Sequence, residues 1–325
     1  MELPVIKWCQ ENGIRMKGHP LAWSHPGANP EWIKRYPVET TEALLRARIT
    51  NIVGGYKGQI DIWDVVNEPV NTKVWLNPMD TAYIREPIEK IADYCEKALR
   101  WAHEANPEAH LMINEFHLIH QGEFNSDPNK TVRQGFIELI TELKRRGAPV
   151  SGLGIQAHEP KECWFTPQET VEAFDELQKL GLPLHITEFI PQSGGKPITG
   201  DYRKGIWDEQ AQAECAEQMY RLAFGHPAVM SITWWAVSDR RVWLKGGGWL
   251  DKDFNSKPAH EVLKKLILQE WRTNLVTKTD TEGKASFRGF YGKYNVELKA
   301  ADGKTHNFEL HLSKDGPKEF AFEVK

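Results

Sequence analysis

The sequence of 325 residues has few cysteines, no long apolar segment and no long run of charge of one sign. No stretch approaches the ~20 apolar residues of a membrane-spanning helix. The formal net charge is only −4, so neither a nucleic acid nor a membrane is an expected partner. The N-terminal residues, MELPVIKWCQENGI, lack the basic start and apolar core of a signal peptide and instead have the pattern of an amphipathic helix.

The four cysteines, Cys9, Cys95, Cys163 and Cys215, lie far apart along the chain. Cys95 and Cys215 each continue the apolar stripe of a predicted helix. We interpret the cysteines as core thiols, although their spacing leaves a disulfide open.

Tryptophan, in contrast, is abundant, with 13 residues. This is more than a core of this size needs, and aromatic rings are natural stacking surfaces for sugars. Composition alone leaves both interpretations open, packing in the core and contact with a carbohydrate.

Short apolar runs alternate with amphipathic helical patterns along most of the chain. The runs lie at residues 15–22, 60–67, 110–115, 150–157, 183–189 and 229–237. Helical patterns lie between them, and Gly or Pro often precedes the next run, as in RRGAPVSG and KLGLPLHI. This repetition predicts βαβ units with a parallel sheet, and therefore an α/β fold with six strands.

The pattern changes after Thr273, where polar and apolar residues alternate and turn signals occur at DTEG, ADGK and KDGP. Residues 274–325 are therefore expected to form a small antiparallel β unit, of a sandwich-like kind, after a larger domain at 1–273. Its aromatic residues are interpreted as packing residues, with a sugar-binding platform as the alternative.

Two carboxylates each follow a buried apolar run, Glu68 after DIWDVVN and Glu188 after LPLHIT. The carboxyl ends of barrel strands form the active-site rim, and three βα units separate these two residues, so they can face each other across it. Glycoside hydrolysis needs such a pair, one protonated to serve the leaving oxygen and one ionised to attack the anomeric carbon. Rim carboxylates held in salt bridges are the structural alternative.

Five segments occur along the chain in the order KGHPLAW, WDVVNEP, GLGIQAH, HITEF and ITWWAVSD. In these segments the sequence resembles glycoside hydrolase family 10, the retaining endo-β-1,4-xylanases. The resemblance covers roughly residues 3–272. It implies a TIM-type (β/α)8 barrel, endo-acting hydrolysis of β-1,4-xylosidic bonds by a double displacement, and xylan or xylo-oligosaccharides as the bound partner. It also implies that no cofactor or metal is needed, and an extracellular location.

The same resemblance assigns roles to residues at the rim. Glu68 would be the acid/base and Glu188 the nucleophile. Asn67 would bond the 2-hydroxyl of the sugar being cleaved, where contacts tighten in the transition state. His158 would hold the nucleophile in place, and Gln156 would line the same subsite.

Four further residues would complete this subsite by the same resemblance. His19 and Trp23 would contact the outer hydroxyls of the sugar. Trp235 and Trp243 would form stacking walls.

The sequence departs from the family pattern in three places. Ile190 stands where the family usually has an Asp, so the expected bond between His158 and Glu188 lacks an orienting charge. INEFH, at 113–117, replaces the usual Asn-Asp-Tyr-Asn. KGH lies on the family's third strand, so the first two strands are expected to be missing. The gap would leave two open sheet edges and favour self-association.

Three other interpretations stay open at this stage. The missing strands and Ile190 are compatible with a carbohydrate-binding protein that is catalytically impaired. The Asn-Glu-Pro motif is shared among related barrels, which leaves another retaining β-glycanase open. A metal site at His117 and His120 has the spacing i, i+3 but no third ligand nearby, and no metal is expected.

Overall fold

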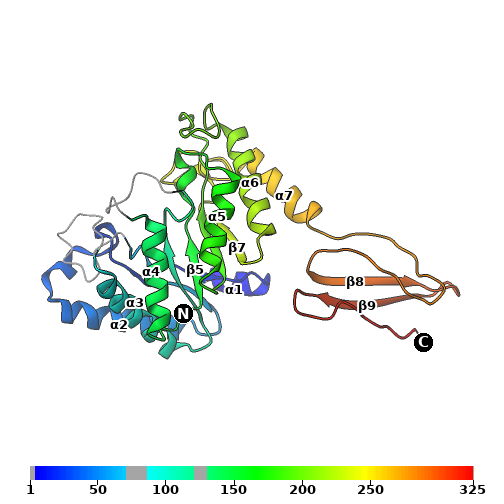
Figure 1. The fold of residues 1–325 in the computed structure, drawn as a ribbon, viewed down its shortest axis with the longest axis horizontal. Helices are drawn as coiled ribbons and strands as arrows, with labels where there is room; N and C mark the ends of the chain where they lie inside the picture. Colours follow the sequence, from blue (N-terminus) through cyan, green and yellow to red (C-terminus); the bar gives the residue numbers. More distant parts are fainter. Residues whose placement is uncertain (1–3, 71–85, 121–129, 325) are drawn as a thin grey trace. The chain divides into compact units, whose positions relative to one another are not determined.

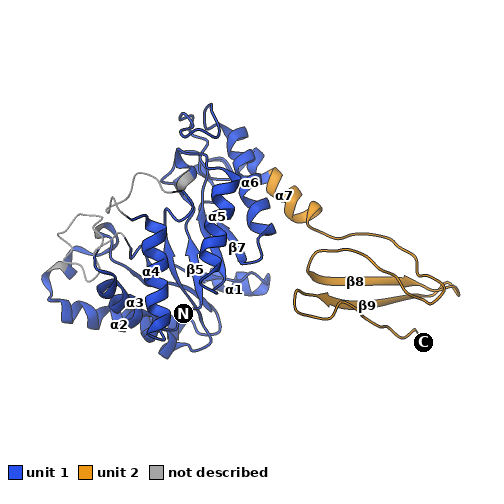
Figure 2. Ribbon diagram, in the orientation of Figure 1, with its two compact units in different colours: residues 1–260 blue, residues 261–325 orange. Residues whose placement is uncertain are grey.

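The computed structural model describes residues 4–70, 86–120 and 130–324 (Figure 1). The chain divides into two compact units, residues 1–260 and 261–325 (Figure 2). Compactness alone does not establish which segment folds independently. The domain boundary expected after residue 273 therefore stays a prediction.

Unit 1 contains one curled parallel sheet with six strand positions. β1 (Lys17–Gly18) and β2 (Ala22–Trp23) share the first position, and both pair with β3 (Ile62–Asn67). The sheet continues through β4 (His110–Glu115), β5 (Gly152–Ile155), β6 (Leu184–Phe189) and β7 (Val229–Trp234). The six positions coincide with the six apolar runs, so the predicted parallel sheet is confirmed.

Helices follow the strands and lie on the outer face of the curled sheet (Figure 1). These helices are α2 (Val38–Gly55), α3 (Ile88–Ala105), α4 (Val132–Arg145), α5 (Pro167–Gln178) and α6 (Glu209–Gly225). A further helix, α1 (Pro4–Glu11), precedes the first strand. Capping boxes at Thr131 and Thr166 start α4 and α5, because each side chain accepts a hydrogen bond from a free backbone N–H of the first turn. This strand–helix arrangement is that of a partial (β/α)8 barrel.

The central strands are buried on both faces. Val65, Met112, Leu153 and Ile186, one on each of β3 to β6, are fully enclosed. Helices cover one face of the sheet, and side chains from neighbouring strands fill the concave face, which explains the nearly continuous apolar runs. No helix in the described ranges is long and apolar enough to cross a membrane.

The sheet is open between its first and last positions. Within the described ranges, β7 pairs only with β6, and β1 and β2 pair only with β3. Apolar side chains are exposed on β7 and in the loop that follows it, Met230 to 67% and Val237 to 60%. No strand of the described chain closes this gap, and pairing with a second chain stays a prediction.

Unit 2 contains most of α7 (Pro258–Lys265), a π-helical turn (Leu266–Glu270) and one antiparallel hairpin of β8 (Gly292–Lys299) and β9 (Thr305–Leu312). The antiparallel unit and its turn near ADGK are confirmed. The sandwich-like form is wrong, because residues 271–291 form no strand and only one strand pair remains. Phe287 and Tyr291 are exposed rather than packed in a core.

Candidate active site

The chain leaves three neighbouring strands in the left-handed backbone conformation. Glu68, His117 and Ala157, which follow β3, β4 and β5, have φ of 54°, 51° and 58°. Residues with a Cβ avoid this region, and holding one there costs of order 1–3 kcal/mol. Strained backbone of this kind accumulates where a site requires a particular side-chain direction. The strain at three adjacent strand ends therefore marks the carboxyl rim of the sheet as a functional region.

The Glu68 carboxylate lies in a half-buried position between two N–H donors. Trp23 Nε1 donates to its Oε2 at 3.0 Å, and Gln156 Nε2 donates to its Oε1 at 2.9 Å. Burial raises the pKa of the Glu68 carboxyl, the two hydrogen bonds lower it, and the nearby charge of Glu188 raises it again. Because the net direction is upward, Glu68 holds its proton at higher pH than an exposed glutamate.

The Glu188 carboxylate is buried and is bound by donors on both oxygens. Asn114 Nδ2 donates to Oε1 at 2.7 Å, and His158 Nε2 lies 2.9 Å from Oε2. His19 Nε2 lies 3.7 Å from Oε1. Hydrogen bonds to both oxygens suit an ionised carboxylate, so Glu68 and Glu188 have environments that fit opposite roles.

A chain of buried amides connects the two glutamates. Gln156 Nε2 donates to Glu68 and also to Asn67 Oδ1 at 3.1 Å. Asn114 Nδ2 donates to the same Asn67 oxygen at 2.8 Å and to Glu188. Both carboxylates are therefore held in one fixed network that spans four strands.

Asn114 is a site residue that the sequence analysis did not assign. It lies on β4 opposite Asn67 of β3 in the strand register. Its own Oδ1 accepts a hydrogen bond from Thr187 Oγ1 at 2.6 Å, which fixes the direction of the amide. The sequence feature that could have identified Asn114 as a site residue is its position at the end of an apolar run, within the segment that departs from the family pattern.

Asp64 is a second residue that the sequence analysis missed. It is fully buried in β3 and accepts from Lys17 Nζ at 2.6 Å, while its Oδ2 lies 2.8 Å from His19 Nδ1. This contact orients the imidazole so that its other nitrogen faces Glu188. A buried acidic residue needs such partners. Its position inside an apolar run is the sequence feature that could have identified Asp64.

The consequence expected from Ile190 is visible in the structure. His158 Nδ1 is buried and has no hydrogen-bond partner among the described residues, and Ile190 is fully buried. The imidazole that contacts the nucleophile candidate is therefore held at Nε2 alone. On the Nδ1 side, the ring is held by packing rather than by a charged partner.

Two tryptophans border this imidazole on the side of β7. The rings of Trp235 and Trp243 meet the His158 ring edge-on, with centroids 5.8 and 5.4 Å away. Trp235 also meets His19 at 5.4 Å. All nine residues expected at the site thus belong to one connected rim, and the two tryptophans stand at its margin with part of each ring exposed.

The histidines of the HLIH segment do not form a metal site in the part of the chain that is described. His120 Nδ1 lies 3.1 Å from Glu169 Oε1 instead. No group of three or more His, Cys, Asp or Glu among the described residues is arranged to hold a metal ion.

Comparison with known proteins agrees with this geometry. The family model for glycosyl hydrolase family 10 matches residues 3–266. A β-1,4-xylanase of Dictyoglomus thermophilum is 29% identical over 74% of this chain and 65% of its own length. Endo-1,4-β-xylanase B of Paenibacillus barcinonensis is 30% identical over 74% of this chain and 70% of its own.

A solved structure shows the same fold. Xylanase 10B from Thermotoga petrophila, in complex with xylobiose, superposes with a TM-score of 0.63 at 28% identity, covering 82% of this chain and 77% of that one. Among other curated relatives, the chain spans only 25% and 37% of the length of two endo-1,4-β-xylanases. The match of the family model covers most of the chain, and the chain belongs to glycosyl hydrolase family 10.

Proposed function

We propose that this chain hydrolyses internal β-1,4-xylosidic bonds of xylan with retention of configuration. One observation carries the proposal: two carboxylates share a buried network at the barrel rim, one with a raised pKa and one bound by donors on both oxygens. This is the electrostatic division that a retaining glycosidase requires. The xylanase names of the relatives support xylan as the substrate class.

In the first step, Glu68 gives its proton to the glycosidic oxygen while Glu188 attacks the anomeric carbon. The bond to the leaving sugar breaks, and a covalent glycosyl-enzyme forms on Glu188. Asn114 and His158 hold the attacking carboxylate in place, so little reorganisation accompanies the attack. Asn67 is placed between the two carboxylates, where a bond to the 2-hydroxyl strengthens as the transition state forms.

In the second step, the ionised Glu68 takes a proton from water, and the water oxygen attacks the anomeric carbon. The bond to Glu188 then breaks, and both carboxyls return to their starting states. Trp23 and Gln156 donate to Glu68 in each state, so they stabilise its ionised form between the two steps. Two inversions at the same carbon give net retention, for which a carboxyl separation of about 5–5.5 Å is expected.

Secretion and self-association are further parts of the proposal. Hydrolysis of polymeric xylan requires contact with a substrate too large to enter a cell.

The exposed β7 edge offers unpaired backbone groups to a second chain, and size-exclusion chromatography of the purified protein would detect such association.

The test is the release of reducing sugar from xylan compared with carboxymethylcellulose. We expect release from xylan and little from carboxymethylcellulose. Release from carboxymethylcellulose at an equal rate would favour another β-glycanase, and binding of xylan without release from either polymer would favour a carbohydrate-binding protein.

The roles of the two glutamates are tested with aryl xylobiosides that have good leaving groups. Glu188→Ala should abolish turnover, because no glycosyl-enzyme can form. Glu68→Ala should still form the glycosyl-enzyme rapidly, because such leaving groups need little protonation. Equal loss in the two variants would overturn the assignment.

A further inference from the structure

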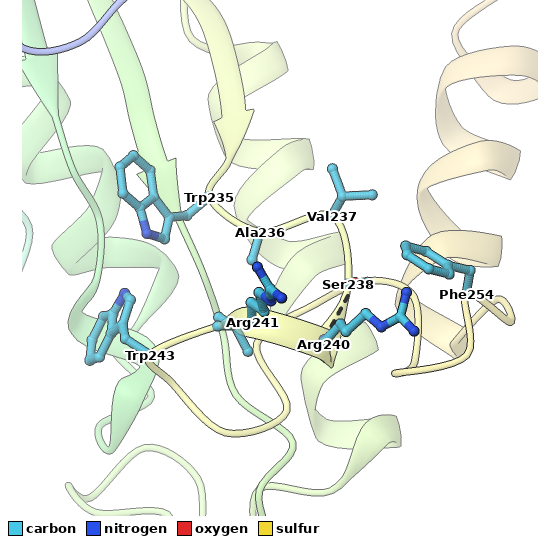
Figure 3. Close-up of a pocket in the computed structure, with 9 residues that line it drawn as sticks. Trp235, Ala236, Val237, Ser238, Arg240, Arg241, Trp243 and Phe254 are labelled. Atoms are coloured by element: carbon cyan, nitrogen blue, oxygen red, sulfur yellow. Dashed lines mark hydrogen bonds between the residues drawn. The ribbon is translucent and has the colours of Figure 1, made fainter.

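A pocket of about 360 Å³ opens beside the tryptophan wall, beyond the carboxyl end of β7 (Figure 3). Trp235 and Trp243 line it on one side, Phe254 lines it on another, and Arg240 and Arg241 lie between them. Its volume lies within the range of about 300–1,000 Å³ that is usual for small-molecule sites. None of the roles assigned to the reaction accounts for the two arginines.

The two guanidinium groups are available to bind an anion. Neither Arg240 nor Arg241 forms an ion pair with any residue in the described ranges, and both are exposed. The adjacent Asp239 does not neutralise them, because it is held by Lys257 Nζ at 3.2 Å and by the Gly248 N–H at 2.7 Å. The pocket therefore presents two unmatched positive charges next to aromatic surface.

A strained turn presents the aromatic face opposite the tryptophans. Phe254 has φ of 65° and is 54% exposed. Asp251 Oδ1 holds this turn by accepting from the backbone N–H groups of Asp253 and Asn255, each at 2.8 Å. The guanidinium carbon of Arg240 lies 5.5 Å from the Phe254 ring centroid, and Figure 3 shows the side chain extending toward that ring. The ring contact favours one direction for the arginine.

The pocket shares two of its lining residues, Trp235 and Trp243, with the catalytic rim. Trp235 and Trp243 form its wall and also meet His158, which lies 2.9 Å from Glu188. A sugar ring at Glu188 therefore lies on one side of these tryptophans, and the arginines lie in the pocket that they border. A group branching from the bound chain near the cleaved sugar is the ligand that this placement fits.

We infer, on the basis of the proposed glycanase function, that this pocket binds a uronic acid side group of the glycan chain. An arginine guanidinium offers parallel N–H donors that match the two oxygens of a carboxylate, and a second positive charge adds to the attraction. The faces of Trp243 and Phe254 offer apolar surface to the C–H face of the branch sugar. The substrate class is thus a xylan decorated with carboxylated branches, rather than only the unbranched chain.

The test compares two oligosaccharides that differ at one group. The first is a xylo-oligosaccharide with a single glucuronic acid branch, and the second is the same compound with its carboxyl reduced to an alcohol. We expect the double variant Arg240→Gln, Arg241→Gln to lose about tenfold in kcat/KM on the acidic compound, mainly through KM. On the reduced compound and on unbranched xylohexaose, we expect less than a twofold change.

Arg221→Gln is the control for loss of an arginine elsewhere, because it removes one positive charge from α6, where Arg221 pairs with Glu217 of the preceding turn. It should leave kcat/KM unchanged on all three substrates. Equal losses by the double variant on the acidic and reduced compounds, or no loss on either, would overturn the inference while leaving the proposed function intact. Absence of hydrolysis of all three by the unaltered protein would instead overturn the proposed function.

Discussion

Removal of the Asn114 side chain should impair catalysis while leaving the fold intact. Asn114→Ala deletes the donor to Glu188 Oε1 at 2.7 Å and the donor to Asn67 at 2.8 Å, together with the acceptor for Thr187. After this change, no hydrogen bond to Glu188 Oε1 remains among the described residues, and His19 Nε2 lies 3.7 Å from this oxygen. The nucleophile would then have one well-made hydrogen bond, from His158.

The size of the effect follows from the charge on Glu188. A hydrogen bond to a charged group contributes about 1.5–3 kcal/mol. If that contribution is lost in the transition state, kcat/KM falls about 10- to 150-fold. The loss of the Asn67 contact adds to this, because Asn67 then lacks one of the two amides that fix it.

The assay is the hydrolysis of an aryl xylobioside, with circular dichroism to verify folding. Asn114→Asp is the matched variant, because it keeps the shape but places a carboxylate against Glu188. It should be slower than Asn114→Ala near neutral pH and should recover as the pH falls, because the protonated carboxyl can donate again. A folded Asn114→Ala protein with less than a threefold loss would refute the role of this amide.

Three further predictions concern pKa values and stability. Trp23→Phe removes a donor that lowers the pKa of Glu68, so the alkaline limb of kcat/KM should move to higher pH, and an unmoved limb would count against this contact. Lys257→Met leaves buried carbonyls and Asp239 without their cation, so urea denaturation should show that the free energy of unfolding falls by about 3 kcal/mol. A decrease below about 1 kcal/mol would be inconsistent with a structural ion pair. Burial lowers the pKa of His185 from 6.5 to about 4, so the unfolded state binds more protons between these values and the free energy of unfolding should decrease as the pH falls through this range. His185→Gln should flatten that dependence, and equal slopes would contradict it.

The sequence was sufficient to predict the parallel sheet and to nominate Glu68 and Glu188. Both follow apolar runs whose length and composition predict strands that are buried on two faces. Polar residues at the ends of such strands reach one rim, whatever the detailed register. This part of the prediction depends on local pattern, and local pattern is what a sequence displays.

Residues whose role depends on register or on long-range contact were harder to identify. Asn114 acts because β4 pairs with β3 at Asn67 and because its amide reaches Glu188, two strands away on β6. The run at 15–22 was expected as one strand, but Pro20 cannot donate a ladder hydrogen bond, and the strand is interrupted there. In the tail, the alternation correctly predicted the strands β8 and β9, but the strands that it also predicted between residues 274 and 291 do not form.

The most direct test of the account is covalent trapping of the nucleophile. A 2-deoxy-2-fluoro xylobioside with a good leaving group should form a stable glycosyl-enzyme. The fluorine slows both steps of the reaction, but the good leaving group keeps the first step fast, so the intermediate accumulates. Mass spectrometry of the digested protein should then find the added disaccharide on the peptide that contains Glu188, and Asn114→Ala should form the adduct more slowly. An adduct on another residue, or hydrolysis of xylan with no adduct at any time, would contradict the proposed double displacement at Glu188.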